Sequence, residues 1–258
     1  MGICVGITSG KGGVGKSSIS IGLGSVLARK GYRVCLVDMD LGLKNLDIMM
    51  GLENRVFYDM IDVAQGKCSL NQALVKSKNE ENLWLIPVSK SVTLNRLNEE
   101  IILNILDELK TKFDYILLDT AAGIESGFTY ATHLADRFIV VTTLDQTSLQ
   151  DADRIIGLLM KENAQKIQCI VNRMNPQYIS KGISLKLMNA LEWLSVECIG
   201  VVYEDEQIMK GYNHGHPSVS NEHSKASECF ESIVRAFEGE EVILPKYHKS
   251  LLKRLFSS

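Results

Sequence analysis

The chain has 258 residues, of which 45% are hydrophobic and 23% charged, so it can bury a large core as one α/β domain. Its six cysteines form no CxxC pair, which argues against a zinc site and against a disulfide framework. No apolar run approaches the ~18 residues that a membrane-spanning helix needs, and no signal peptide precedes the first apolar segment. We therefore expect a cytoplasmic protein with reduced thiols.

The net charge of −3 is unevenly distributed along the chain. Four basic residues fall within the last 13 positions, where no acidic residue occurs, and the remainder has 24 basic against 31 acidic residues. An acidic body is a poor general nucleic-acid binder, so we expect no specific nucleic-acid partner. The basic C-terminus requires its own explanation.

Short apolar runs alternate with longer amphipathic stretches from one end of the chain to the other. We predict strands at 3–8, 33–38, 83–87, 115–119, 137–143, 167–172 and 198–203. We predict helices at 16–30, 95–112, 146–162, 183–194 and 222–237. Several strands lack polar alternation, which is typical of strands covered on both faces. The order predicts a mostly parallel sheet with helices on both faces, whose ligands bind at the carboxyl ends of the strands.

The segment GKGGVGKS, residues 10–17, matches the phosphate-binding pattern G-x-x-x-x-G-K-[ST] and lies between a predicted strand and a predicted helix. In such a loop the glycines let backbone N–H groups turn toward an anion, and the helix that follows presents its positive end there. Lys16 is expected to contact the outer phosphates and Ser17 to hold Mg²⁺. The pattern predicts a P-loop NTPase.

Three aspartates follow predicted strands and support this interpretation. Asp119 is the last residue of the predicted strand YILLD. A carboxylate at this strand end commonly supports Mg²⁺ in P-loop enzymes. Asp38 and Asp40 follow RVCLV at the end of another strand. Each aspartate alone could be a solvated strand end, but three at one edge of the sheet favour a metal and water site.

A second lysine of the loop, Lys11, stands five residues before Lys16. One reading is a solvated lysine on an exposed loop. The other starts from a loop that wraps its own phosphates and leaves this side chain pointing outward. An outward lysine can stabilise transferred charge only in another subunit's site, which predicts a two-fold dimer with Lys11 acting in trans.

The last 15 residues, LPKYHKSLLKRLFSS, form an amphipathic pattern at 100° per residue. Large apolar residues gather on one half of the helical wheel, and His248 is the one misfit among them. That half holds Leu244, Tyr247, Leu251, Leu252, Leu255 and Phe256. The other half holds Lys246, Lys249, Lys253 and Arg254. A docked terminal helix needs only the apolar half, whereas a wholly basic polar face favours binding to anionic membrane lipids.

Several motifs carry a family resemblance. KGGVGKSS resembles the deviant Walker loop of the MinD/ParA ATPases, in which the first lysine is the family signature. The segments DMDLGLKNLDIMMG (38–51), NQAL (71–74), AGIE (122–125) and LLKRLF (251–256) are similar to the MinD subgroup in particular. The resemblance extends over the whole chain.

The resemblance implies ATP and Mg²⁺ as cofactors, with Lys11 and Lys16 as catalytic lysines. It assigns the nucleotide phosphates to a cradle formed by Gly10, Lys11, Gly12, Gly13, Val14, Gly15, Lys16, Ser17 and Ser18. Asp40 would position or activate the attacking water, and Asp119, with Ser17, would serve the metal, Asp119 through water. Asp38 and Asn45 would belong to the switch segment that senses the γ-phosphate.

The resemblance also implies residues around the base and at a partner-binding surface. Asn172 and Arg173 match residues that face adenine. Glu204 and Asp205 match a second segment beside the base, where this chain has Tyr203 in place of a common proline. Asp151, Asp153 and Arg154 match the start of a helix at which regulators dock.

By the same resemblance we expect an ATPase domain over residues 1–240 and a linker with a membrane-targeting helix over 241–258. The protein would form an ATP-dependent homodimer on the inner face of the cell membrane and recruit a MinC-like division inhibitor to control septum placement. A MinE-like or other topological regulator would act on it. The alternatives are a ParA-type DNA-segregation ATPase, a flagellar-number regulator of the same clan, and a membrane-recruited scaffold without turnover. An iron–sulfur reductase of the clan is excluded, because no cysteine lies between Cys68 and Cys169 to bridge two subunits.

Overall fold

The computed structural model describes residues 1–39, 46–87, 99–123, 132–217, 225–241 and 244. The residues predicted for water activation (Asp40), for the switch (Asn45) and for membrane binding lie outside these ranges. The membrane residues are Lys246, Tyr247, Lys249, Leu251, Leu252, Lys253, Arg254, Leu255 and Phe256.

Eight strands of the described chain form a single sheet in the order β3-β4-β2-β5-β1-β6-β7-β8. Their bounds are β1 Ile3–Thr8, β2 Val34–Met39, β3 Val75–Lys76, β4 Leu83–Ile86, β5 Tyr115–Thr120, β6 Arg137–Thr142, β7 Ile167–Met174 and β8 Glu197–Tyr203. All neighbouring strands run parallel except β3, which pairs antiparallel with β4 at the sheet edge. The predicted mostly parallel sheet is confirmed.

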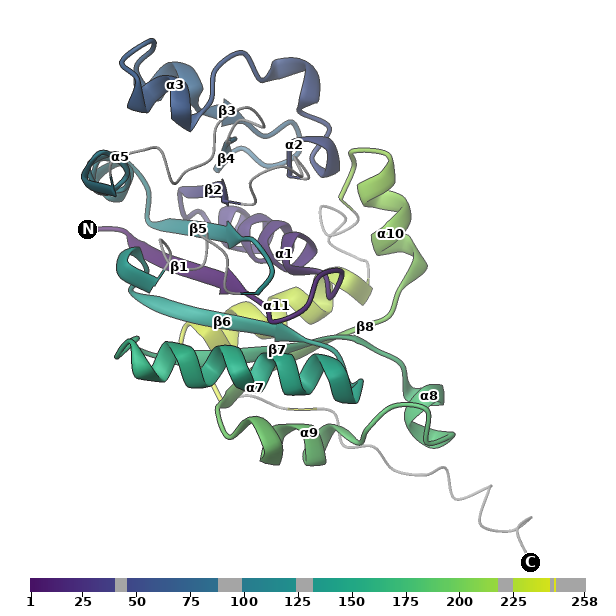
Figure 1. Ribbon diagram of the computed structural model, residues 1–258. Helices are drawn as coiled ribbons and strands as arrows, with labels where there is room; N and C mark the ends of the chain where they lie inside the picture. Colours follow the sequence, from purple (N-terminus) through teal and green to yellow (C-terminus); the bar gives the residue numbers. More distant parts are fainter. Residues whose placement is uncertain (40–45, 88–98, 124–131, 218–224, 242–243, 245–258) are drawn as a thin grey trace, which may run out of the picture.

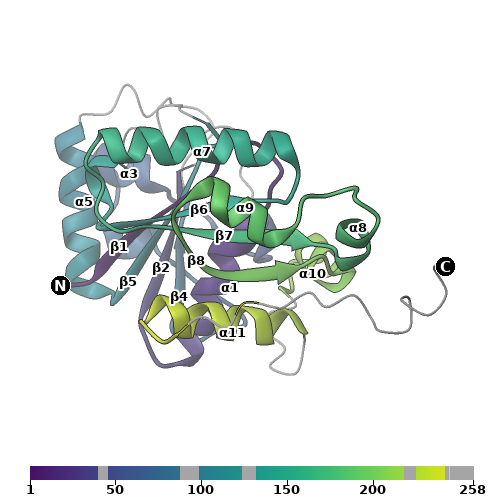
Figure 2. The ribbon, with the colours of Figure 1, turned by 90° about the horizontal axis from the view of Figure 1, so that it is seen from below.

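Helices connect the strands and cover both faces of the sheet (Figures 1 and 2). The longer ones are α1 Lys16–Arg29, α5 Glu99–Lys112, α7 Gln146–Lys161, α9 Leu187–Leu194, α10 Glu206–Asn213 and α11 Lys225–Phe237. Shorter ones are α2 Leu46–Met49, η1 Glu53–Arg55, α3 Met60–Ala64, α4 Leu70–Ala73 and α8 Pro176–Ser180. Figure 2 shows α5, α7 and α9 on one face of the sheet and α1 with α11 on the other.

The core consists of two hydrophobic layers separated by the sheet. One layer packs α5, α7 and α9 against residues such as Phe138 and Val140. The other packs α1 and α11 against residues such as Ile7 and Leu117. Because both faces of β1 and β6 are buried, their side chains are apolar almost throughout, which explains the unbroken apolar runs in the sequence.

The predicted elements agree with the structure, and most differ by one to four residues at their ends. The predicted helix 183–194 begins only at Leu187, and the first residues of the predicted helices 95–112 and 222–237 lie outside the described residues. The sequence prediction missed β3, α10 and the short helices α2, α3, α4 and α8. β3 has two residues, too few to show any periodicity, and α10 is an eight-residue helix begun by the cap of Asp205, whose carboxylate accepts from the Gln207 N–H at 2.8 Å.

The sheet order places β1 between β5 and β6. Strands β2 to β5 lie on one side of β1, and β6 to β8 lie on the other. Such a switch point leaves an opening at the carboxyl end of the strand, where ligands of open α/β sheets bind. The glycine loop follows β1 directly. Topology and motif therefore point to the same edge of the sheet.

The end of the described chain is tied to the body by Leu244. This residue lies inside the predicted C-terminal segment 241–258, yet it packs against the hydrophobic layer that contains α7 and α9. The domain boundary expected between residues 240 and 241 stays a prediction. Leu244 was expected on the apolar half of the amphipathic segment 244–258, but it packs against the body instead, and residues 245–258 lie outside the described residues.

Candidate functional site

The phosphate-binding loop joins β1 to α1 through a left-handed turn. Gly15, the N-cap of α1, has a φ of 96°, and its carbonyl accepts the first helical bond from the Ile19 N–H at 3.0 Å. The Asn172 side-chain amide donates to the Val14 carbonyl at 2.7 Å and fixes the loop from β7. Lys16 is buried with 8% exposure at the first position of the helix. The loop thus has a rigid base beside the positive end of α1.

Replacing Gly15 by alanine should damage the loop for two separate reasons. A β-carbon there would lie 2.2 Å from the Asn172 amide nitrogen, and an L-residue at that φ costs about 1–2 kcal/mol. We expect Gly15→Ala to weaken nucleotide binding at least about tenfold, which a fluorescent ATP titration would measure.

The matched control for this variant is Gly157→Ala in α7. Apart from the backbone of its own helix, no atom lies within 4 Å of its added β-carbon, and alanine is favoured over glycine in a helix interior by about 0.5–1 kcal/mol. This variant should bind nucleotide like the parent and unfold at a slightly higher temperature. Equal nucleotide affinity in Gly15→Ala would contradict the assigned loop geometry.

Two aspartates meet at the carboxyl ends of adjacent strands. Asp38 of β2 and Asp119 of β5 are register partners, and their exposed fractions are 4% and 1%. The Ser20 hydroxyl on α1 donates to the Asp119 carboxylate at 3.1 Å. Asp119 is itself level with Ile7 of β1, two residues before the loop begins. The predicted convergence of these two carboxylates is confirmed, and Ser20 is an addition that the motif did not indicate.

The oxygen donors at this edge fit Mg²⁺ rather than a softer metal. Asp38, Asp119 and the loop hydroxyl of Ser17 offer carboxylate and hydroxyl oxygens, the ligands of hard cations. In the described part of the chain, no group of three or more His, Cys, Asp and Glu side chains could hold a metal alone. The arrangement suits a metal shared with a substrate phosphate. The metal role of Ser17 and Asp119 stays a prediction.

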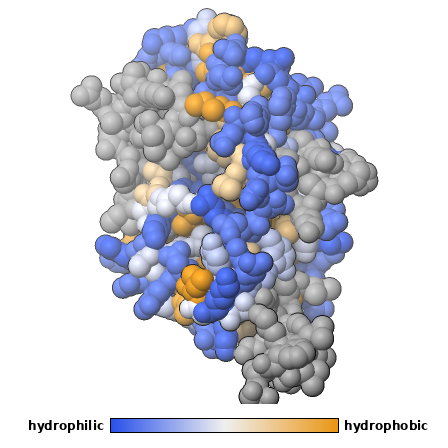
Figure 3. Space-filling view, turned by 90° about the vertical axis from the view of Figure 1, so that its right-hand side faces the viewer, coloured by the Kyte–Doolittle hydropathy of each residue, from blue (hydrophilic) through white to orange (hydrophobic). Residues whose placement is uncertain are grey.

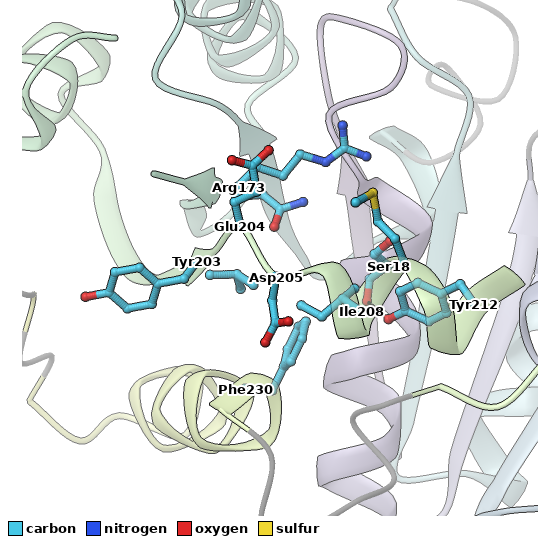
Figure 4. Close-up of a pocket in the computed structure, with 11 residues that line it drawn as sticks. Ser18, Arg173, Tyr203, Glu204, Asp205, Ile208, Tyr212 and Phe230 are labelled. Atoms are coloured by element: carbon cyan, nitrogen blue, oxygen red, sulfur yellow. Dashed lines mark hydrogen bonds between the residues drawn. The ribbon is translucent and has the colours of Figure 1, made fainter. Parts of the chain in front are cut away.

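A pocket opens beside the first turn of α1 (Figure 4). The predicted base-side residues meet here, since Asn172, Arg173, Glu204 and Asp205 line it together with Ser18. The Glu204 carboxylate accepts from the Asn175 side-chain amide at 2.8 Å, which holds the loop after β8 to the loop after β7. The pocket adjoins the phosphate loop, because Ser18 follows the loop directly and Asn172, which also lines the pocket, donates to Val14.

Helix α10, which was not predicted from the sequence, closes one side of the pocket. The Tyr212 hydroxyl donates to the Ser18 carbonyl at 2.9 Å, and Ile208 and Phe230 also line the cavity. Burial raises the pKa of Tyr212, so this hydroxyl stays protonated as a donor. Figure 4 shows Tyr203, the residue that departs from the family pattern, directed away from the other labelled side chains. No sequence signal connects Tyr212 to Ser18 across 194 positions.

Lys11 lies on the outside of the loop, as predicted, but its ammonium is not simply solvated. Its Nζ donates to the Thr147 hydroxyl at 2.8 Å and lies 3.4 Å from Asp145 Oδ1, both at the start of α7. The side chains of Lys11 and Asp145 are 45% and 49% exposed. Both readings of Lys11, a solvated lysine on an exposed loop and a lysine that acts in trans, stay predictions.

The predicted partner-docking residues lie on α7, the helix that Lys11 contacts. Asp153 and Arg154 are exposed, whereas Asp151 is half-buried against the phosphate loop. A β-carbon on Gly10 would lie 2.2 Å from the Asp151 carbonyl oxygen, so only glycine permits this close packing. The start of α7 and the loop therefore form one packed unit.

The carboxyl edge of the sheet is mainly hydrophilic. Figure 3 views the side that lies to the right in Figure 1, where the hydrophobic residues form small separate spots. Among the helices that the structure describes, none combines the length and hydrophobicity needed to cross a bilayer.

Comparison with known proteins agrees with this geometry. A family model described as ParA, NUBPL iron-transfer P-loop NTPase, matches residues 2–238. The septum site-determining protein MinD of Bacillus subtilis (strain 168) is 42% identical over 262 aligned residues, covering 100% of this chain and 98% of that protein. The chain belongs to the MinD/ParA family of P-loop ATPases. The expected family, fold and ATPase class are thereby confirmed.

Solved structures place the same fold in MinD proteins. The chain of a MinC:MinD cell division protein complex from Aquifex aeolicus has a TM-score of 0.87 and 37% identity, covering 95% of this MinD/ParA ATPase and 100% of that chain. A septum site-determining MinD from Pyrococcus horikoshii OT3, complexed with Mg-ADP, has a TM-score of 0.81 and 26% identity, covering 93% and 97%. MinD of Thermotoga maritima is 44% identical over 100% of this chain and 96% of its own.

Proposed function

We propose that this chain is an ATP-dependent dimerising ATPase that binds the inner membrane surface and recruits a division inhibitor to control where the septum forms. The observation that carries the proposal is that the two lysines of the phosphate loop lie in different surroundings. Lys16 is buried at the base of the phosphate loop, whereas Lys11 lies exposed on its outer side. One lysine serves the subunit's own nucleotide, and the other is available to a second subunit.

The chemistry follows from the groups at the strand ends. Lys16 and the N–H groups of the loop hold the outer phosphates, and Asn172 keeps the loop in shape through Val14. Mg²⁺, held near Ser17 and Asp119, would neutralise charge on the phosphate oxygens. Asp40 orients water, with Asp38 and Asn45 in the segment that senses the γ-phosphate. Lys11 of the partner subunit stabilises the transferred charge, as a trans cation does.

The base-side pocket supports ATP as the nucleotide. Asn172, Arg173, Glu204 and Asp205 present amide, guanidinium and carboxylate groups around one opening next to Ser18. Such groups can donate to and accept from an adenine edge, and Ile208 and Phe230 supply apolar surface for its faces. The solved MinD of Pyrococcus horikoshii carries Mg-ADP. We assign the same nucleotide class to this chain.

Membrane binding is assigned to the basic segment after Leu244. Each basic residue near anionic lipid contributes about 1 kcal/mol, but a short helix is marginal in water and costs ordering free energy. One tail therefore binds weakly, whereas two tails on one dimer gain about 10²–10⁴ in avidity. ATP binding thus controls attachment by controlling dimerisation, and hydrolysis releases both. The protein would be cytoplasmic without ATP and peripheral on the membrane with it.

Two observations support the proposed partner proteins: the solved complex of a relative and the exposed residues of α7. A MinD of Aquifex aeolicus is solved in a complex with MinC, so we propose a MinC-like inhibitor as a partner here. The exposed Asp153 and Arg154, with Asp151 beside the loop, would form the docking surface for this inhibitor or a MinE-like regulator. A ParA-type segregation ATPase is disfavoured, because the body has 24 basic against 31 acidic residues.

Sedimentation with anionic liposomes in ATP and in ADP, with gel filtration of the same samples, tests the proposal. We expect a dimer that pellets with vesicles in ATP and a soluble monomer in ADP. A protomer that pellets equally in both nucleotides would refute ATP control of membrane binding. Phosphate release in the presence of vesicles and partner separates an ATPase from a scaffold without turnover.

A further inference from the structure

Two cysteines face each other across the last two strands of the sheet. Cys169 of β7 and Cys198 of β8 are register partners, and both side chains belong to the hydrophobic layer that contains α7 and α9. Neighbouring strands lie about 4.7–4.9 Å apart, within the Cα separation of about 4.4–6.8 Å that a disulfide requires. Both thiols are free. We call these two residues the β7–β8 cysteine pair.

The other buried cysteines, Cys4 and Cys35, are not neighbours of this kind. They belong to the same hydrophobic layer, but both are register partners of Ile116, because β5 lies between their strands. Two strand spacings put their Cα atoms about 9–10 Å apart, beyond the limit of about 7 Å for a disulfide. Among the four buried cysteines, all of which the structure describes, only the β7–β8 cysteine pair is close enough to bond.

The two thiols of the pair differ in their surroundings. The hydrogen bond that Cys169 donates to Cys198 lowers the pKa of Cys198, although burial opposes this shift, and it raises the pKa of Cys169 together with burial. The thiolate is the form of cysteine that attacks an oxidant. Cys198 is the second residue of the edge strand and keeps 8% exposure, whereas Cys169 has none. Attack on an oxidant is therefore expected from Cys198, with Cys169 as the resolving thiol.

We propose that Cys169 and Cys198 are a redox-active pair that a hydroperoxide converts into a disulfide, and that this bond weakens nucleotide binding. The Cys198 sulfur attacks the peroxide, so that a sulfur–oxygen bond forms, the oxygen–oxygen bond breaks and an alcohol leaves with the thiol proton. The Cys169 sulfur then attacks the Cys198 sulfur, and the hydroxyl group leaves as water with the second thiol proton. The two thiols lose two electrons in total, and the peroxide gains them.

The pair lies on the two strands that carry the base-side pocket. Asn172, three residues after Cys169, lines this pocket and donates to the Val14 carbonyl of the phosphate loop at 2.7 Å. Glu204, the residue after β8, lines the same pocket and accepts from the Asn175 amide. A disulfide holds its β-carbons about 3.5–4.5 Å apart, less than the strand spacing, so it draws β7 and β8 together. The walls of the pocket shift with their strands, and the hydrogen bond from Asn172 to the phosphate loop weakens.

The test for the disulfide uses the full chain, reduced and then treated with hydrogen peroxide. The remaining thiols are alkylated under denaturing conditions before digestion with trypsin and mass spectrometry. Trypsin releases the two cysteines in separate peptides, 167–173 and 187–210, each with one cysteine. We expect these peptides to be linked, with the loss of two hydrogen atoms. Unlinked peptides, or Cys198 carrying only added oxygen, would overturn the proposal.

Cys169→Ala and Cys198→Ala each remove one partner, so neither variant should give the linked peptides. Cys229→Ala, which removes a partly exposed thiol of α11 from outside the pair, is the matched control and should form the disulfide like the parent. Melting temperatures near that of the parent would confirm that the variants fold. A loss of folding in one alanine variant of the pair leaves the other variant to decide.

Titration with a fluorescent ATP analogue measures the effect of the disulfide on the pocket. We expect the affinity of the oxidised parent to fall about threefold to tenfold, the effect of one weakened hydrogen bond, and to return after treatment with dithiothreitol. Cys169→Ala and Cys198→Ala should bind alike before and after peroxide. Linked peptides with unchanged affinity would overturn the effect on nucleotide binding.

Disulfide formation does not depend on the proposed function, whereas the loss of affinity rests on the proposed nucleotide pocket. The two failures are therefore distinguishable. If the reduced parent does not bind ATP, the proposed function is wrong, and linked peptides would still support the redox-active pair. If the reduced parent binds ATP and the peptides stay unlinked, the proposed function stands and the redox-active pair is wrong.

Discussion

Replacing Lys16 by alanine should lower the affinity for ATP at least about 100-fold. The ammonium is buried at the first position of α1, where it can donate charge-assisted hydrogen bonds to phosphate oxygens. Such bonds contribute about 1.5–3 kcal/mol each, so the loss of two reaches this magnitude. Titration with a fluorescent ATP analogue measures the affinity, and phosphate release should fall in parallel.

Lys11→Ala is the matched control, because it removes the same charge from the same loop. Its ammonium contacts Thr147 and Asp145 rather than the interior of the loop, so a monomer should bind nucleotide with nearly the parent affinity. Dimerisation and turnover should be lost instead. If both variants lost nucleotide affinity equally, the assignment of separate roles to the two lysines would be wrong.

Deleting residues 246–258 should abolish the ATP-dependent sedimentation with anionic liposomes while nucleotide binding persists. The segment contributes four basic residues, worth about 1 kcal/mol each near anionic lipid, and its large apolar side chains add to this. Because both tails of a dimer are lost together, the affinity for vesicles should fall at least about 100-fold. Dimerisation measured by gel filtration should be unaffected.

Two point variants test whether the amphipathic pattern, rather than length, is responsible. Leu251→Gln combined with Leu255→Gln removes apolar surface from one side of the predicted helix and should largely abolish sedimentation. Ser250→Ala lies on the polar side and removes no charge, so it should pellet like the parent. ATP-dependent pelleting of the truncated chain would show that another surface binds the membrane.

The phosphate loop and the main strands could be predicted because their signals are local. Strands such as β1 and β6 are covered on both faces, so burial leaves uninterrupted apolar runs in the sequence. The loop turns backbone N–H groups toward phosphate only if its glycines, lysine and hydroxyl residue stand at fixed spacing. That spacing is visible in the sequence. The meeting of Asp38 and Asp119 also followed, because parallel strands end at the same edge.

The residues that sequence reasoning missed act through long-range contacts. Tyr212 is 194 positions from Ser18, and Thr147 is 136 positions from Lys11. Asn172 was expected near adenine from resemblance, and the structure adds a hydrogen bond to Val14 that no motif describes. Which residues become partners in such contacts depends on strand order and helix packing. A single sequence carries no direct signal for either.

The sequence by itself therefore determined the fold class and the position of the phosphate loop, since these depend on periodicity and spacing within short segments, and the resemblance of its motifs indicated the family. Only the tertiary structure decided where the Lys11 ammonium lies. Its partners at the start of α7 reach it because β6 pairs beside β1, and that pairing places both carboxyl ends at one edge. An outward lysine could be inferred from the loop, but its contact with Thr147 and Asp145 could not.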